Sequence, residues 1–317
     1  MTVPVLSSLV LGLAWFAALN AAASLAASVI AHRVLASNAA RRATALLALR
    51  LFPSAVALVY VAALFLPAHW RFEPADAEET FGVVLYALAA VGMALVLRSA
   101  WRVAAVARAG WRLRACRHLP RFGPAPAAYE VPGLSGVSLA GVFRTRILVG
   151  SPVRRALTSA ELNVAVAHEL AHRGALDNLK RFAMLCAPDL FGGSDASRRV
   201  EAEWRASAEC LADSRAVAGD DTRAVNLASA LLKVSRLTSA PSSFGTSPAW
   251  STLHDPPLLE MRVRRLVGGA MPAAPAGPRR ASRLAGLAIL AVMLLAGGGA
   301  IAPSLHRLTE ALVRILP

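Results

Sequence analysis

The segment from Thr2 to Ala31 contains no ionisable side chain. An apolar helix of this length can cross a bilayer with some tilt. The whole chain of 317 residues is 56% hydrophobic and has a mean hydropathy of +0.52, which is too apolar for an ordinary soluble domain. The composition therefore predicts a membrane protein.

Further apolar segments predict three more membrane spans. The first span is predicted at residues 3–31, and the three further spans are predicted at residues 51–68, 81–97 and 284–303. The span at 81–97 is short, and a buried helix is the alternative interpretation of it. A cleaved signal peptide is disfavoured for the first span because no basic residue precedes its apolar core.

Arginines are unevenly distributed among the connecting segments. The segment between the first two spans contains arginines and no acid, whereas residues 67–80 are mainly acidic and residues 98–121 again contain only basic charges. The positive-inside rule then predicts a bacterial inner-membrane protein with both termini outside and residues 98–283 in the cytoplasm. The same asymmetry accounts for much of the net charge of +15, so we expect the lipid bilayer rather than nucleic acid as a partner.

The segment after the third span is predicted to lie on the membrane surface. Trp101 and Trp111 alternate with arginines there, which is typical of an amphipathic helix on an anionic leaflet. We assign residues 98–123 to this helix and a linker, 124–267 to a cytoplasmic domain, 268–283 to a second linker and 304–317 to a short external tail. The cysteines Cys116, Cys186 and Cys210 fall in the predicted cytoplasmic part, so we expect reduced thiols and no disulfide.

The predicted domain begins with a strand and continues with helices. Residues 142–149 alternate between apolar and polar side chains, which predicts a strand whose edge could pair with an extended peptide; an ordinary packed strand is the alternative. Helices are expected around residues 168–172, at 198–217 and at 221–237. Residues 238–251 are rich in Ser, Pro and Gly and predict a loop.

The letters HELAH at 168–172 form an H-E-x-x-H motif. On a helix, His168 and His172 lie on one face, where a single zinc ion can bind both, and Glu169 can act as a base. Thr158 and Glu161 have capping-box spacing, which predicts that this helix starts beside them. Two histidines packed in a core, with a surface glutamate, are the alternative.

A catalytic zinc ion needs three protein ligands and one open position for water. Glu209 and Asp213 are four residues apart on a predicted helix. We expect Glu209 to be the third ligand and Asp213 to support a zinc-bound histidine through its second ring nitrogen. Glu201, Glu203 and Asp177 remain alternative ligands; a solvated acidic face is the other interpretation of the first two, and a role at the helix end that of Asp177.

These residues together resemble the transmembrane zinc metallopeptidases of the BlaR/MecR type. The resemblance rests on GVFRTRILV at 141–149, HELAH, Asp177 with Asn178, and Glu209 with Asp213. The letters LHDPP at 253–257, leading to Arg262, are more similar to HtpX-type and CAAX-prenyl endopeptidases, which share the gluzincin core. The resemblance implies one zinc ion per chain, and it implies oxyanion or substrate contacts from His254 or Arg262.

The expected fold class is a mainly α polytopic membrane protein, with four transmembrane helices and a cytoplasmic zincin-like α+β metallopeptidase domain between spans three and four. The resemblance implies an endopeptidase that cleaves a cytoplasmic regulatory protein, such as a transcriptional repressor, or itself in signal transduction. Only 14 residues follow Pro303, so an extracellular penicillin-binding sensor domain is not expected. The alternatives are an HtpX-like quality-control peptidase and a catalytically silent receptor or scaffold stapled by zinc.

Overall fold

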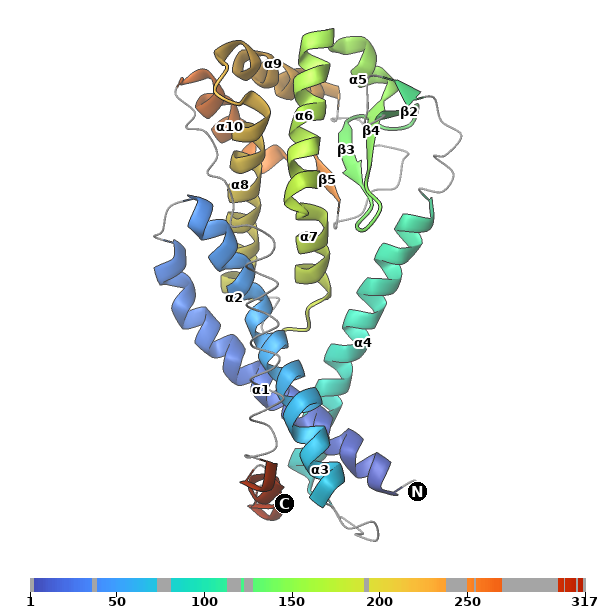
Figure 1. Ribbon diagram of the computed structural model, residues 1–317, viewed down its shortest axis with the longest axis vertical. Coiled ribbons are helices and arrows are strands. Elements are labelled where there is room, and N and C mark those ends of the chain that lie inside the picture. The colour runs from blue at the N-terminus through green and yellow to red at the C-terminus, as the bar shows by residue number, and fades with distance from the viewer. Residues whose placement is uncertain are drawn as a thin grey trace.

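The apolar N-terminal segments form long helices, and the described residues within 121–267 form an α+β domain above them (Figure 1). The computed structural model describes residues 3–35, 39–72, 81–112, 121–122, 128–190, 194–237, 250–253, 255–269, 302–304, 306–311 and 313–315. The predicted fourth span at 284–303 lies almost entirely outside these residues, as do His254, Cys116 and most of the predicted loop at 238–251.

Among the described residues, three helical runs are long and apolar enough to cross a membrane. They are α1 (Val3–Leu35), the continuous run of α2 (Ala39–Val59), the π-helical η1 (Tyr60–Phe65) and α3 (Leu66–Phe72), and α4 (Val83–Arg112). The candidate spans within them are Val5–Ala31, Arg42–Phe72 and Val83–Trp111. Membrane association through three helices therefore agrees with the composition, although the second helical run is longer than the predicted span at 51–68.

The predicted third span at 81–97 and the predicted surface helix from 98 belong to one helix. α4 runs through both segments without a break. No proline or glycine occurs between Gly92 and Gly110, so nothing local ends the helix at the first arginine. The third helix is therefore much longer than its apolar core suggests.

A close approach of two backbones fixes the packing of α4 against α1. A Cβ atom added to Gly92 would lie 2.3 Å from the carbonyl oxygen of Leu13. Any side chain at this position would therefore push the two helices apart, and small residues are the usual solution where membrane helices pack closely.

The domain contains a five-stranded sheet in the order β1-β2-β4-β3-β5. Its strands are β1 (Arg121–Phe122), β2 (Ala128–Val131), β3 (Val137–Ala140), β4 (Arg146–Gly150) and β5 (Ser251–Thr252). β4 pairs in parallel with β2 and antiparallel with β3, so it is an inner strand. The prediction that this strand offers a free edge to a peptide is therefore wrong.

The predicted strand at 142–149 is also too long at its start. Gly141 has a φ of 93° and begins a connection between β3 and β4, and β4 begins only at Arg146. The side chain of Phe143 is 81% exposed in that connection. We call residues 142–145 the hairpin tip. The alternating sequence pattern extends into the hairpin tip because Val142 and Phe143 are apolar. The tip itself is not part of the sheet.

Helices pack on the sheet and carry the H-E-x-x-H motif. They are α5 (Ser151–Ala156), α6 (Ser159–Ala175), α7 (Asp177–Cys186), α8 (Asp195–Val217), α9 (Asp221–Leu237), the 3-10 helix η3 (Pro256–Leu258) and α10 (Leu259–Val267). Leu139, Ile147, Val164, Leu227 and Leu231 are among the buried residues of the core between the sheet, α6 and α9. The prediction of a helix at 221–237 is confirmed, and α8 begins three residues before its predicted start.

The capping box at the start of α6 is confirmed. The hydroxyl of Thr158 accepts a hydrogen bond from the backbone N–H of Glu161, whose carboxylate accepts from the backbone N–H of Thr158. At the other end, Leu176 has a left-handed conformation with φ 59° and ψ 36°. This residue separates α6 from α7 and turns Asp177 back towards the end of α6.

The turn between α7 and α8, residues 187–190, is held by polar side chains of the membrane helices. Asn20 of α1 donates to the carbonyl of Pro188 at 2.8 Å and accepts from the backbone N–H of Leu190 at 3.0 Å. Ser24, also on α1, donates to Asp189 at 2.8 Å. Further donors to this part of the chain are Ser54 of α2, to Pro188, and Arg98 and Arg102 of α4, to the carbonyls of Asp189 and Leu185.

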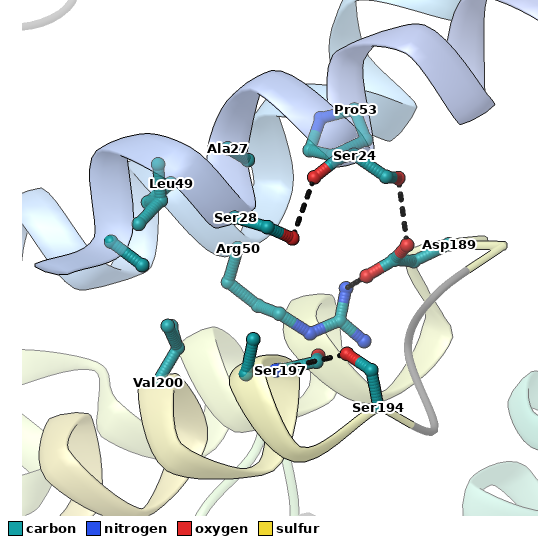
Figure 2. A pocket seen from close by; sticks show the side chains of 12 residues that line it. Ser24, Ala27, Ser28, Leu49, Arg50, Pro53, Asp189, Ser194, Ser197 and Val200 are labelled. Atoms are coloured by element: carbon teal, nitrogen blue, oxygen red, sulfur yellow. Dashed lines mark hydrogen bonds and ion pairs between the residues drawn. The ribbon is translucent and has the colours of Figure 1, made fainter.

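Arg50 of α2 is the buried centre of this junction (Figure 2). Its guanidinium lies 3.4 Å from a carboxylate oxygen of Asp189 and donates to Glu201 of α8 at 2.7 Å. Arg42 forms a second ion pair with α8, at 3.4 Å from Glu203. Arginines that the sequence places beside the membrane therefore contact the domain, which packs against the basic ends of the membrane helices.

Candidate metal site

α6 places the three functional residues of the motif in the interior of the domain. His168, Glu169 and His172 are each 0% exposed. Because the histidines are four residues apart on a helix, their rings meet on one face, and their Nε2 atoms are 3.0 Å apart. The alternative in which Glu169 lies on the surface is thus contradicted by the burial of its side chain.

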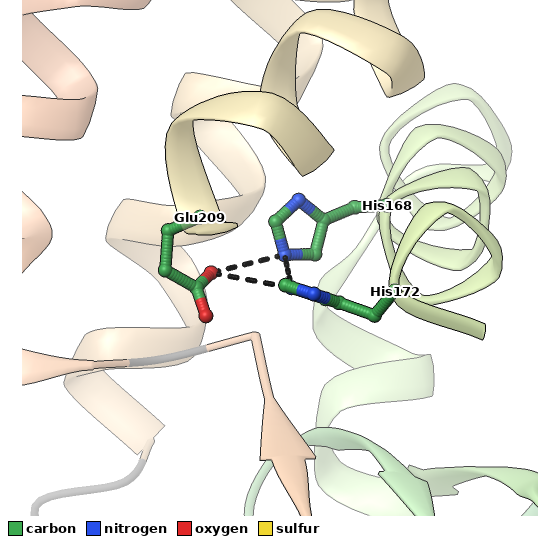
Figure 3. A group of neighbouring side chains, drawn as sticks. All are labelled: His168, His172 and Glu209. Atoms are coloured by element: carbon green, nitrogen blue, oxygen red, sulfur yellow. Dashed lines mark hydrogen bonds and ion pairs between the residues drawn. The ribbon is translucent and has the colours of Figure 1, made fainter. Parts of the chain in front are cut away.

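α8 brings Glu209 to the same point (Figure 3). Its Oε2 atom lies 3.3 Å from Nε2 of His168 and 3.4 Å from Nε2 of His172. One point can lie about 2 Å from all three atoms of such a triangle, and zinc bonds to nitrogen and oxygen are about 2.0 to 2.2 Å long. The group could therefore hold a metal ion, and the prediction that Glu209 joins the two histidines agrees with this geometry.

The buried oxygen of Glu209 supports this interpretation. Oε2 has no hydrogen-bond partner among the described residues, although burying an unpaired carboxylate oxygen is costly. Arg262 lies 3.2 Å from it as an ion pair without hydrogen-bond geometry, and Arg181 donates to the other oxygen at 3.0 Å. The carboxylate is therefore oriented by two arginines while Oε2 still faces the histidines.

Each histidine has its own carboxylate partner behind it. Nδ1 of His168 lies 2.9 Å from Asp213, and Nδ1 of His172 lies 2.9 Å from Asp177. An acceptor at Nδ1 holds the proton there and leaves Nε2 free to bind a metal ion. The supporting position predicted for Asp213 agrees with this contact. Asp177 is not one of the three converging ligands; it supports His172, a contact that the sequence analysis missed.

Arg262 was predicted as an oxyanion or substrate contact, and it lies buried beside Glu209 and Asp213. Its side chain is 1% exposed. It donates to both oxygens of Asp213, at 2.7 and 2.9 Å, and to the carbonyl of Leu253 at 2.8 Å. Arg262 therefore orients Asp213, and through it His168, with its donors directed into the protein.

Among the described residues, only one of the two carboxylate oxygens of Glu169 has a hydrogen-bond partner. Oε2 accepts from the hydroxyl of Ser251 at 3.1 Å, while Oε1 has no hydrogen-bond partner among the described residues. Burial raises the pKa of the Glu169 carboxyl, although both histidines oppose this effect. A buried carboxyl with one unpaired oxygen beside the ligand group has the position and character of a proton acceptor.

Asn178 holds the segment that carries Ser251. Its side chain donates to the carbonyls of Leu139 and Gly141, both at 2.7 Å, and accepts from the backbone N–H of Ser251 at 2.9 Å. It thereby ties β5 and the end of β3 to α7. The sequence analysis placed Ser251 in a loop and gave Asn178 no separate role, because their contact joins positions 73 residues apart.

The charged groups of the ligand group shift one another's pKa. Burial lowers the pKa of His172, but Glu209 and Asp177 outweigh it and raise the value to about 10. Burial would raise the pKa of Glu209, yet His172 and Arg262 hold it well below the usual range. A metal ion at this point would replace the proton of His172 as the cation that balances Glu209.

Two of the alternative ligands, Glu201 and Glu203, lie apart from the three converging residues. Glu201 and Glu203 pair with arginines of α2, so they belong to the junction with the membrane helices rather than to a solvated acidic face. In the described part of the chain, Cys186 and Cys210 are free thiols, as predicted, and burial raises the pKa of both.

No family model, curated protein or solved structure matches the chain.

Proposed function

We propose that the chain is a membrane-anchored zinc endopeptidase that cleaves a cytoplasmic regulatory protein or itself. The observation that carries the proposal is the convergence of His168, His172 and Glu209 beside the free oxygen of Glu169. Two nitrogen ligands and one carboxylate are typical of catalytic zinc sites, whereas structural sites are usually closed and rich in thiolates. This ligand set favours a hydrolase over a scaffold stapled by zinc.

The role proposed for each residue of the site follows from its contacts. His168, His172 and Glu209 would hold the zinc ion, which supplies a water molecule activated for attack and polarises the scissile carbonyl. Glu169 would accept a proton from the attacking water at Oε1 and return it to the leaving amine. Ser251 would keep the other oxygen of Glu169 in place.

The membrane junction supports the proposed orientation. Arg42, Arg50, Arg98 and Arg102 lie at the end of the membrane helices that contacts the domain. Because basic residues favour the cytoplasmic side, the domain and its substrate would be cytoplasmic. The resemblance to BlaR/MecR-type peptidases favours a regulatory protein, such as a repressor, as the substrate.

The test uses the full-length chain purified in detergent and loaded with zinc. Glu169→Gln preserves size but removes the proton acceptor. We expect this variant to keep its zinc and its thermal stability, while cleavage of an unfolded test protein and of the chain itself falls by at least about 100-fold. Metal content, melting temperature and product formation would be measured on the same preparation.

Glu260→Gln is the matched control because it makes the same chemical change on the exposed face of α10, where Glu260 only pairs with Arg264. It should cleave as fast as the unmodified chain. Equal cleavage by Glu169→Gln would refute the hydrolase and leave zinc a structural role. Preference for unfolded membrane proteins over repressors would favour quality control.

A further inference from the structure

A cleft opens beside the candidate metal site, between the hairpin tip, the end of α6 and the start of α7. Its volume is about 650 Å³, within the range of typical ligand-binding pockets. The buried residues His172 and Asp177 are part of its lining, and His172 also faces Glu209. A molecule held in this cleft would therefore lie next to the proposed catalytic residues.

One part of the cleft is apolar. Leu139 and Leu170 line it beside α6, and the side chains of Phe143 and Leu176 stand at its rim, 81% and 45% exposed. Large apolar side chains that remain exposed around a cavity are typical of a surface that binds a partner. This part of the cleft suits an apolar side chain of a peptide.

Another part of the cleft is basic. Arg144, on the hairpin tip, and Arg173, on the last turn of α6, are both exposed and line it. Within the described part of the chain, neither guanidinium has a hydrogen bond, ion pair or ring contact. By contrast, Arg154 and Arg198, which are exposed elsewhere on the domain, each reach a carboxylate of their own.

Asp177, the acidic residue that lines the cleft, does not neutralise these arginines. Asp177 is buried, lies 2.9 Å from Nδ1 of His172 and receives a hydrogen bond from Lys180 at 2.8 Å. Its negative charge is therefore balanced locally. The charges of Arg144 and Arg173 remain available to a bound molecule and favour a negatively charged one.

We propose that this cleft is the substrate-recognition site, and that it binds a peptide segment in which an apolar residue is followed or preceded closely by an acidic one. The acidic side chain pairs with Arg144 and Arg173, and the apolar side chain contacts Leu170 and Leu176. This inference rests on the proposed peptidase function, since it names the class of substrate that the same site accepts.

The test measures binding separately from cleavage. The zinc-loaded Glu169→Gln chain in detergent would be titrated with fluorescent peptides that contain a Leu-Glu pair or the matched Leu-Gln pair. We expect the acidic peptide to bind about 5- to 10-fold more tightly, the scale of a partly exposed ion pair at each arginine. Added salt should remove most of this difference.

Substitutions of exposed arginines identify the source of the preference. Arg144→Gln and Arg173→Gln, each made in the Glu169→Gln chain, should each reduce the difference between the two peptides, and together they should abolish it, whereas Arg198→Gln on the outer face of α8 should leave it unchanged. Replacing both cleft arginines by glutamate should reverse the preference, so that a Leu-Lys peptide binds more tightly than Leu-Glu. The exposed position of both cleft arginines makes loss of folding unexpected, and the melting temperature checks it.

The outcomes distinguish the two proposals. Equal binding of the acidic and amide peptides, including no measurable binding of either, overturns the recognition site. If the unmodified chain cleaves test proteins without any preference for acidic segments, the peptidase stands and the recognition site fails. If acidic peptides bind through Arg144 and Arg173 but nothing is cleaved, the cleft is a binding site and the peptidase fails.

Discussion

Asp213 lies between His168 and Arg262, with one oxygen 2.9 Å from Nδ1 of the histidine and both oxygens bonded to the guanidinium. Asp177 has the same relation to His172 and Lys180. The two arrangements differ in burial, because Arg262 is enclosed while the side chain of Lys180 is 30% exposed. Each histidine is therefore oriented by a carboxylate. The carboxylate behind His168 pairs with a buried cation, whereas the one behind His172 pairs with a partly exposed cation.

This difference predicts distinct effects of Asp177→Asn and Asp213→Asn. Both variants should weaken zinc affinity by about 10- to 100-fold, since each removes the charged acceptor behind one histidine. Only Asp213→Asn should also destabilise the fold, by about 3 kcal/mol, because it removes the carboxylate that accepts two hydrogen bonds from the enclosed Arg262. Zinc affinity would be measured by competition with a chelator, and stability by thermal unfolding in detergent.

Asp195→Asn is the control for these variants. Asp195 pairs with Arg198 on the surface, so this change should alter neither zinc affinity nor stability measurably. Equal destabilisation by Asp177→Asn and Asp213→Asn would contradict the role assigned to the burial of Arg262.

Glu209→Gln tests the third ligand. The amide keeps the shape of the side chain but is a much poorer zinc ligand than a carboxylate, so we expect affinity to fall by more than about 100-fold. Glu203→Gln makes the same change six residues before Glu209 on α8, where Glu203 pairs with Arg42, and it should retain one zinc ion per chain. Metal analysis after dialysis would decide whether Glu209 or Glu203 is the third ligand. Retention of zinc by Glu209→Gln would rule out Glu209.

The sequence predicts the parts of the site that depend on local geometry. His168 and His172, and Glu209 and Asp213, are pairs at i and i+4 on helices, so each pair has to share one face. The capping box is equally local, because Thr158 and Glu161 contact each other across a single turn. These features needed no knowledge of the rest of the fold.

The parts that the sequence did not predict depend on distant contacts. Asp177 reaches His172 only because Leu176 adopts a left-handed conformation, which is uncommon for leucine. Ser251 reaches Glu169 from a strand that begins 82 residues later in the chain. The arginines of α4 satisfy carbonyls of the turn after α7, a contact that their own segment does not indicate.

The junction with the membrane helices predicts unequal effects of two neutralised acids. Asp189→Asn removes the charge beside the buried Arg50 and should destabilise the chain by about 3 kcal/mol, because a buried guanidinium loses one of its carboxylates. Glu203→Gln removes a partner of the half-exposed Arg42 and should cost less than about 1 kcal/mol. Thermal unfolding in the same detergent compares the two, and equal losses would show that burial of the junction does not determine its strength.

The folding stability of the domain should depend on pH through Glu161. Burial would raise the pKa of its carboxyl, but hydrogen bonds from Lys233, Ser229 and the backbone N–H of Thr158 lower it to about 2. A carboxyl whose pKa is lower in the folded than in the unfolded chain stabilises the fold above its ordinary pKa of about 4.5, and this stabilisation is lost as the pH falls towards 2.

Glu161→Gln is the variant that isolates this effect, since glutamine at the same position can still complete the capping box while it cannot pair with Lys233. At pH 7 it should be less stable than the unmodified chain by about 1 to 2 kcal/mol, a value reduced for the exposure of the lysine. The difference in melting temperature should shrink as the pH is lowered from about 4.5 and vanish near pH 2. A difference that stays constant across this range would mean that the carboxylate charge of Glu161 does not stabilise α6.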